Sequence, residues 1–220
     1  MKYKELQALN REILRTREPG IRSKLIPVVN TLLPTQRYMI ISSDPSSETN
    51  KRRPVLEKHS GFEERVLALF FYGSDDTDAV NRVRYFYPEY KSIFLSNFYW
   101  THYSKVYADG NPGPFWAKQF LFREIALTQP KVIILFGGLV TRFLFGPGNF
   151  RERVNRILSW QGTPTICSLH PSRDWNMRRR TDFDFDSTWT LIRQTCAFNS
   201  DDRTRLEELA QKTSQITTLF

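Results

Sequence analysis

The chain has 220 residues, and its 32 lysine and arginine residues against 23 acidic residues give a formal net charge of +9. This excess favours a polyanionic partner, nucleic acid first and an anionic membrane second. This length suits one sizeable α/β domain, and the apolar segments continue without an obvious linker, so residues 1–220 are expected to form a single domain. No apolar stretch reaches the roughly 18 residues that a membrane span needs, and two cysteines are too few for a four-cysteine zinc site or an iron–sulfur cluster.

Short apolar runs typical of strands alternate along the chain with longer segments that have helical spacing. Buried strands are predicted at residues 38–41, 91–97, 132–136 and 164–169. Helices are predicted at residues 2–18, 61–72, 114–129, 186–197 and 201–212. Because parallel strands need crossover connections, this order predicts an α/β three-layer sandwich, with helices on both faces of a mostly parallel four-stranded sheet. Residues 1–20 then form an N-terminal helix, and residues 186–220 form a C-terminal helical extension.

Three of the predicted strands lead directly into a polar side chain: Asp44, Asn97 and His170. If these strands run in the same direction, the three side chains converge on the edge of the sheet where α/β proteins bind ligands. Pro45 also restricts Asp44 to extended geometry. Taken alone, Asp-Pro followed by Ser-Ser is more often a turn and a helix cap, and a lone histidine is usually structural. The convergence is what favours a functional site.

At these motifs the chain resembles the uracil-DNA glycosylase superfamily, in its branch without an iron–sulfur cluster. Ser42-Ser43-Asp44-Pro45 takes the place of the family's Gly-Gln-Asp-Pro-type loop. Phe94-Leu95-Ser96-Asn97 matches a strand that ends in a base-reading asparagine, and His170-Pro171-Ser172 is the family's third signature. The resemblance covers residues 38–175 and implies a uracil-DNA glycosylase-like fold.

The resemblance also implies a reaction, in which the N-glycosidic bond of a base flipped out of DNA is hydrolysed. Asp44 would orient or deprotonate the attacking water, and His170 would donate a hydrogen bond to the base oxygen on which negative charge builds. Asn97 would bind the edge of the pyrimidine, and Phe62 is the candidate for stacking on it, although a core phenylalanine is an equally good interpretation. The nucleophile is water, so the enzyme would be monofunctional and would need no metal or organic cofactor.

Other residues are expected to contact DNA. Ser172 would bind a phosphate, while Arg173 or Trp175 would fill the space that the flipped nucleotide leaves. Two basic segments follow the first and third motifs, and they are candidates for phosphate contacts or, equally, for a solvated surface. Their candidate residues are Arg52, Arg53, Arg178 and Arg179.

The chain departs from the family pattern at two positions of the first motif. Ser42 replaces the usual glycine, so the local backbone is expected to differ. Ser46 stands where strict uracil enzymes have a tyrosine that blocks the 5-substituent of the pyrimidine. The pocket is therefore expected to tolerate a C5 substituent, from thymine-like bases to bulkier modified pyrimidines.

The segment after Asn97 is expected to be a loop, and it is rich in aromatic residues that suit either stacking on bases or packing. Packing is expected for at least half of them: Tyr99, Trp100, Tyr103 and Tyr107. His102 lies in the same segment and is a further candidate for the pocket wall. Cys167 and Cys196 are both expected to be small core residues in a reducing compartment.

The sequence therefore predicts a monofunctional DNA glycosylase that acts as a monomer in base excision, in the cytoplasm or at the nucleoid of a prokaryote, without a membrane. Two alternatives stay open. A non-catalytic nucleic-acid-binding protein of the same fold would keep its biological effect when Asp44 is mutated. A hydrolase of nucleosides or nucleotides would cleave free nucleosides, and DNA would not compete. Gly137-Gly138 lacks the glycine spacing of a dinucleotide-binding dehydrogenase.

Overall fold

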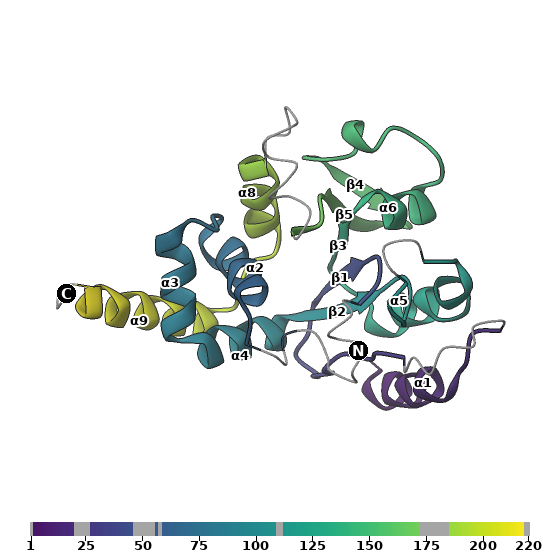
Figure 1. Cartoon of the computed structure of the whole chain (residues 1–220), viewed down its shortest axis with the longest axis horizontal. Coiled ribbons are helices and arrows are strands. Elements are labelled where there is room, and N and C mark those ends of the chain that lie inside the picture. Colours follow the sequence, from purple (N-terminus) through teal and green to yellow (C-terminus); the bar gives the residue numbers. More distant parts are fainter. Residues whose placement is uncertain are drawn as a thin grey trace.

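A computed structural model describes residues 2–19, 27–45, 56, 59–108, 112–171 and 185–217, with the backbone alone at 185, 186 and 213–217 (Figure 1). Over these residues the chain is an α/β protein whose mostly parallel sheet has helices on both faces. The strands of the sheet, in spatial order, are β2 (Phe98–His102), β1 (Tyr38–Ser42), β3 (Val132–Phe136), β5 (Thr163–Ser168) and β4 (Ile157–Trp160). The first four run parallel, and β4 is an antiparallel edge strand.

The helices divide between the two faces of the sheet (Figure 1). One face is covered by α2 (Gly61–Tyr72), α3 (Thr77–Tyr85), α4 (Tyr87–Asn97), α8 (Phe185–Thr195) and α9 (Ser200–Thr217). The other is covered by α1 (Tyr3–Arg15), by α5 (Phe122–Thr128) with a preceding π-helical turn (Ala117–Leu121), and by α6 (Gly138–Phe145). None of the helices described is both long enough and apolar enough to cross a bilayer.

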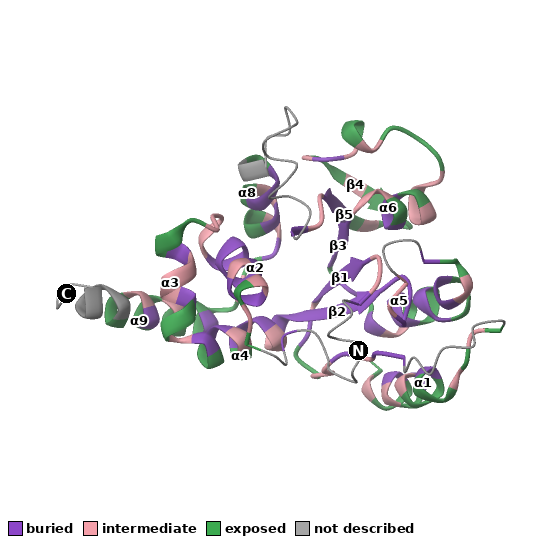
Figure 2. Cartoon of the chain, viewed as in Figure 1, coloured by how far each residue is buried: buried purple, intermediate pink, exposed green. Residues whose placement is uncertain are grey.

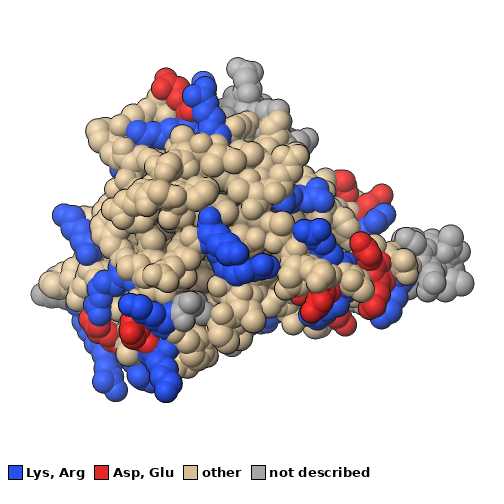
Figure 3. Space-filling model, turned by 180° about the vertical axis from the view of Figure 1, so that it is seen from behind, with Lys and Arg blue, Asp and Glu red and all other residues tan. Residues whose placement is uncertain are grey.

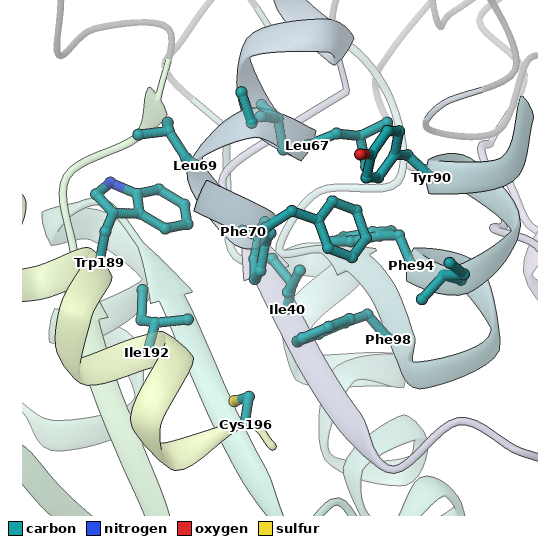
Figure 4. Packing of buried hydrophobic residues seen from close by; sticks show 14 of the residues in the cluster. Ile40, Leu67, Leu69, Phe70, Tyr90, Phe94, Phe98, Trp189, Ile192 and Cys196 are labelled. Carbon is teal, nitrogen blue, oxygen red and sulfur yellow. The ribbon is translucent and has the colours of Figure 1, made fainter. Parts of the chain in front are cut away.

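Strands β1, β2 and β3 are buried on both faces of the sheet, which their apolar side chains require (Figure 2). Successive side chains of β1 point to opposite faces, so that Ile40 belongs to the core beneath α2 and Met39 to the core beneath α1 and α5. The core beneath α2 is centred on Phe70 (Figure 4). Its ring centroid lies 4.9 Å from that of Phe94, 4.8 Å from that of Phe98 and 5.0 Å from that of Trp189. We call this cluster the aromatic core.

The strand predicted at residues 91–97 is wrong, because this segment is the end of helix α4. Tyr87, Tyr90, Phe94 and Asn97 are buried at spacings of three or four residues, which is the period of a helix. Pro88 lies in the first turn, where its missing N–H costs nothing. The second strand begins only at Phe98, so the sheet contains the aromatic segment that was predicted to be a loop.

A further strand, β4, was not predicted. It has four residues, alternates between exposed and half-buried positions, and therefore lacks the continuous apolar run of the other strands. Gln161 and Gly162 join it to β5 with φ values of 49° and 84°, as in the tight turns that connect antiparallel hairpins. The sheet of the described chain consequently has five strands rather than four. The other three predicted strands are confirmed, within a few residues at their ends, as β1, β3 and β5.

Candidate functional site

The connections of the sheet change direction at the carboxyl ends of β1 and β3. These strands are neighbours, but the chain leaves β1 towards α2 on one face and leaves β3 for α6 on the other (Figure 1). A crevice at such a point, outside the carboxyl ends of the strands, is where open α/β sheets bind ligands. We call this edge of the sheet the carboxyl rim.

The strand register brings two histidines and one carboxylate to the carboxyl rim. His102 is the last residue of β2 and pairs with Ser42, the last residue of β1, two residues before Asp44. Ser168 pairs with the last residue of β3, and His170 follows two residues later. The structure thus brings together Asp44 and His170, as the sequence predicted, and adds His102.

Two aromatic rings contact His170. The Phe62 ring lies parallel to the imidazole, with an interplanar angle of 1° and centroids 6.1 Å apart. Phe136, at the end of β3, presents its ring nearly at right angles, with centroids 6.0 Å apart. Phe62 is placed by the first turn of α2, which begins after the N-cap residue Ser60. The predicted stacking residue therefore lies beside the predicted catalytic histidine, and the two rings provide apolar surface at the rim.

The carboxylate of Asp44 is held by donors from two loops. Its Oδ1 accepts from the Ser43 hydroxyl at 2.9 Å, and its Oδ2 accepts from the backbone N–H of Ala108 at 3.1 Å. The second loop is itself fixed to the first, since Tyr103 donates from its backbone to the Ser42 carbonyl at 2.7 Å. These bonds hold the carboxylate in a defined orientation at the end of β1.

The structure shows a role for Ser42, which stands where uracil-DNA glycosylases have a glycine. It is buried, and its hydroxyl accepts from the indole Nε1 of Trp100 at 3.0 Å. This bond satisfies a donor that is buried in β2 and fixes the ends of β1 and β2 side by side. Trp100, Tyr99 and Tyr103 are all buried, so the expectation that at least half of the aromatic segment packs is confirmed.

The predicted position of Asn97 at the carboxyl rim is wrong. Asn97 ends α4 and precedes β2, so it lies at the amino end of the parallel strands, opposite Asp44 and His170. Its amide donates to Asp202 Oδ2 at 2.7 Å and accepts from Arg37 Nη2 at 3.0 Å. The first bond connects α4 to α9 and the second connects α4 to the residue before β1, so both ends of the amide of Asn97, a residue that is 1% exposed, are used. Asn97 is a buried structural residue because the strand it was assigned to is a helix.

His102 was only a secondary candidate in the sequence, and the structure makes it a residue of the rim. It is 4% exposed, and its Nδ1 has no hydrogen-bond partner among the residues described. Burial, and then the nearby Lys105 and His170, hold the pKa of His102 well below its ordinary value of 6.5. The signal in the sequence was the alternation Phe98, Trp100, His102, which places the imidazole on the face of the aromatic core.

The neutral state of His102 predicts a loss of stability in mild acid. The unfolded chain takes up a proton below about pH 6.5 and the folded chain does not, so this contribution is complete above pH 6.5 and is lost as the pH falls. Between pH 7.5 and 5.5 the free energy of unfolding should fall by about 1.4 kcal/mol more in the parent than in a His102→Gln variant. Urea titrations at both values measure this difference, and equal losses in the two proteins would contradict it.

A buried ion pair supports the end of β2 from the other face of the sheet. Lys105 Nζ lies 2.6 Å from Glu124 Oε2, and both side chains are 1% exposed. Glu124 Oε1 accepts from the Tyr99 hydroxyl at 2.8 Å and from the Thr101 hydroxyl at 2.9 Å. Lys105 also donates to the backbone carbonyl of His102 at 2.9 Å. The pair therefore fixes the backbone that carries His102.

The remaining predicted site residues lie outside the residues that the structure describes: Ser46, Arg52, Arg53, Ser172, Arg173, Trp175, Arg178 and Arg179. The described residues hold no group of three or more His, Cys, Asp or Glu side chains that is arranged for a metal ion. Both cysteines are free and buried. On the face opposite to that of Figure 1, lysine and arginine side chains occupy several separate areas, and acidic side chains lie among them (Figure 3).

Comparisons with known proteins do not assign the chain to a family. No family model matches the chain, and no curated protein is significantly similar to it. The site is therefore defined by the convergence of Asp44, His102 and His170, with Phe62, at the carboxyl rim.

Proposed function

We propose that the chain is a monofunctional DNA glycosylase with a uracil-DNA glycosylase-like fold, which hydrolyses the N-glycosidic bond of a flipped pyrimidine. One observation carries the proposal: a partly exposed carboxylate, Asp44, and an imidazole, His170, follow the carboxyl ends of β1 and β5, and the rings of Phe62 and Phe136 lie beside His170. The net charge of +9 suits a DNA substrate.

Each group supplies what the reaction needs. As the bond between the sugar and the base breaks, positive charge develops on the sugar and negative charge on the base. The Asp44 carboxylate offsets the first, orients the water whose oxygen bonds to the sugar carbon and accepts the proton that this water loses. His170 donates a hydrogen bond to the base oxygen that gains electrons. The base leaves in its protonated, neutral form, and DNA retains an abasic site.

The apolar rings supply the binding surface. A base cannot be attacked while it is stacked in the duplex, so it must be flipped out at a cost of a few kcal/mol. Stacking on an aromatic side chain recovers about 1–3 kcal/mol for each base, whatever its identity. Phe62 is suited to this role because its ring lies beside His170. We also propose that the pocket tolerates a substituent at C5 of the pyrimidine, because Ser46 stands where strict uracil enzymes have a tyrosine.

The test is a panel of labelled single-stranded and duplex oligonucleotides that contain uracil, mismatched thymine, hypoxanthine or C5-modified cytosines. We expect alkali-labile abasic sites at a pyrimidine, formed by the parent protein and not by its Asp44→Asn variant. Treatment with borohydride should trap no covalent complex, because water and not a lysine is the nucleophile.

Two outcomes would overturn the proposal in different ways. If no oligonucleotide is cut but DNA binds tightly at moderate salt, the chain is a nucleic-acid-binding protein of this fold. If free nucleosides are cleaved and DNA does not compete, the chain is a nucleoside hydrolase. If borohydride traps the protein on DNA, the monofunctional mechanism is rejected, but the proposal of a DNA glycosylase is not.

A further inference from the structure

His102 occupies a defined position at the carboxyl rim. It is the last residue of β2 and is in register with Ser42, whose hydroxyl binds Trp100 Nε1. The alternation of β2 puts the His102 side chain on the same face as Phe98 and Trp100, which belong to the aromatic core. This is also the face on which α2 carries Phe62. The imidazole therefore lies on the side of the sheet where the base would bind.

The surroundings of His102 fix its backbone and leave one ring nitrogen unsatisfied. Its backbone carbonyl accepts from Lys105 Nζ at 2.9 Å, and Lys105 is itself paired with Glu124. The ring is almost completely buried, yet Nδ1 has no hydrogen-bond partner among the described residues. Buried polar atoms in native proteins are nearly always hydrogen-bonded, so this exception needs an explanation, and a ligand atom bound at the rim would supply one.

We propose that Nδ1 of His102 binds the polar edge of the flipped pyrimidine and selects the base, in the position that the sequence had suggested for Asn97. The inference deepens the proposed function and rests on it. His102 is a specificity residue, and the groups that act on the bond remain Asp44 and His170.

The chemistry of imidazole differs from that of an amide at this position. A neutral imidazole nitrogen is either a donor or an acceptor, according to the tautomer, whereas an asparagine offers both at once. Nδ1 accepts from the N3–H of a uracil-type base, or donates to N3 of a cytosine-type base. The ligand class is therefore a pyrimidine whose N3 edge faces the end of β2, and discrimination between the 4-oxo and 4-amino forms depends on one hydrogen bond.

The test compares excision of uracil and of a C5-modified cytosine by the parent, His102→Asn and His102→Ala. We expect His102→Ala to lose about 10- to 100-fold in rate on the preferred base, the effect of one buried hydrogen bond. The ratio of the two rates should change by at least about tenfold in His102→Asn, because the amide offers a different donor and acceptor pattern. His59→Asn is the matched control, since the side chain of His59 is 48% exposed and pairs with Glu64.

A second measurement tests binding of a pyrimidine to His102 independently of excision. Nitrogen NMR of histidine-labelled protein reports the His102 ring, and we expect its Nδ1 resonance to shift when a free pyrimidine is added. Equal slowing on both bases, with no shift, would make His102 structural and overturn the inference, while Asp44-dependent excision would still support the glycosylase. If the parent excises no base, the proposed glycosylase function is rejected. The presence or absence of the NMR shift then still decides whether His102 binds a pyrimidine.

Discussion

Replacing Asp44 by asparagine should slow release of the base by about 10²- to 10⁴-fold, the usual contribution of a general base. The amide has nearly the same shape as the carboxylate, and its oxygen can still accept from the N–H of Ala108. It has no negative charge to offset the developing charge on the sugar, and it cannot take a proton from the water. The loss is therefore expected in the chemical step, and single-turnover kinetics with excess enzyme measure it directly.

The control for this variant is Asp78→Asn, which removes an exposed aspartate from the first turn of α3. It should excise bases at the parent rate, and both variants should bind the uncut oligonucleotide with parental affinity. A rate for Asp44→Asn within a factor of about three of the parent would show that the carboxylate does not act on the bond. Tight binding without excision in both the parent and the variant would favour the binding-protein alternative.

The fold was predictable from the sequence where one period dominates. The runs at 38–41 and 132–136 are short, wholly apolar and bounded by turn residues, which favours buried strands, and β1 and β3 are there. The segment 91–97 satisfies both periods, because a short apolar run does not distinguish a buried strand from a buried helix. Tyr87 and Tyr90, which lie before that segment, carry the helical spacing that decides between them.

The site was predictable where it depends on strand ends that were correctly assigned. Asp44 and His170 follow β1 and β5, and they reach the rim as expected. The carboxyl end of the second strand lies at residue 102, five residues later than predicted, so the residue at the rim is His102 and not Asn97. A pair such as Lys105 and Glu124 was beyond prediction, since its members come from a loop and a helix and meet only in the folded chain.

That ion pair leads to the largest expected change in stability. Glu124→Gln should lower the free energy of unfolding by about 3–5 kcal/mol, because it leaves the Lys105 ammonium buried without its counter-charge. Domains of this kind are stable by about 5–15 kcal/mol, so the variant should unfold at a much lower urea concentration. Burial already acts to lower the pKa of Lys105, while Glu124 opposes that effect. The ammonium of the variant should therefore lose its proton more readily, and the loss of stability should shrink as the pH rises.

The neighbouring residue on α5 provides the matched control. Arg123 forms a two-bond contact with Glu12, at 2.8 Å and 2.7 Å, but both side chains are about half exposed. Solvent screens that pair, so Glu12→Gln should cost at most about 1 kcal/mol. Equal urea midpoints for Glu12→Gln and Glu124→Gln would show that water reaches the buried pair. If Glu124→Gln is instead strongly destabilised but folded in the cold, its effect on excision should resemble that of a His102 variant, because Lys105 holds the His102 carbonyl.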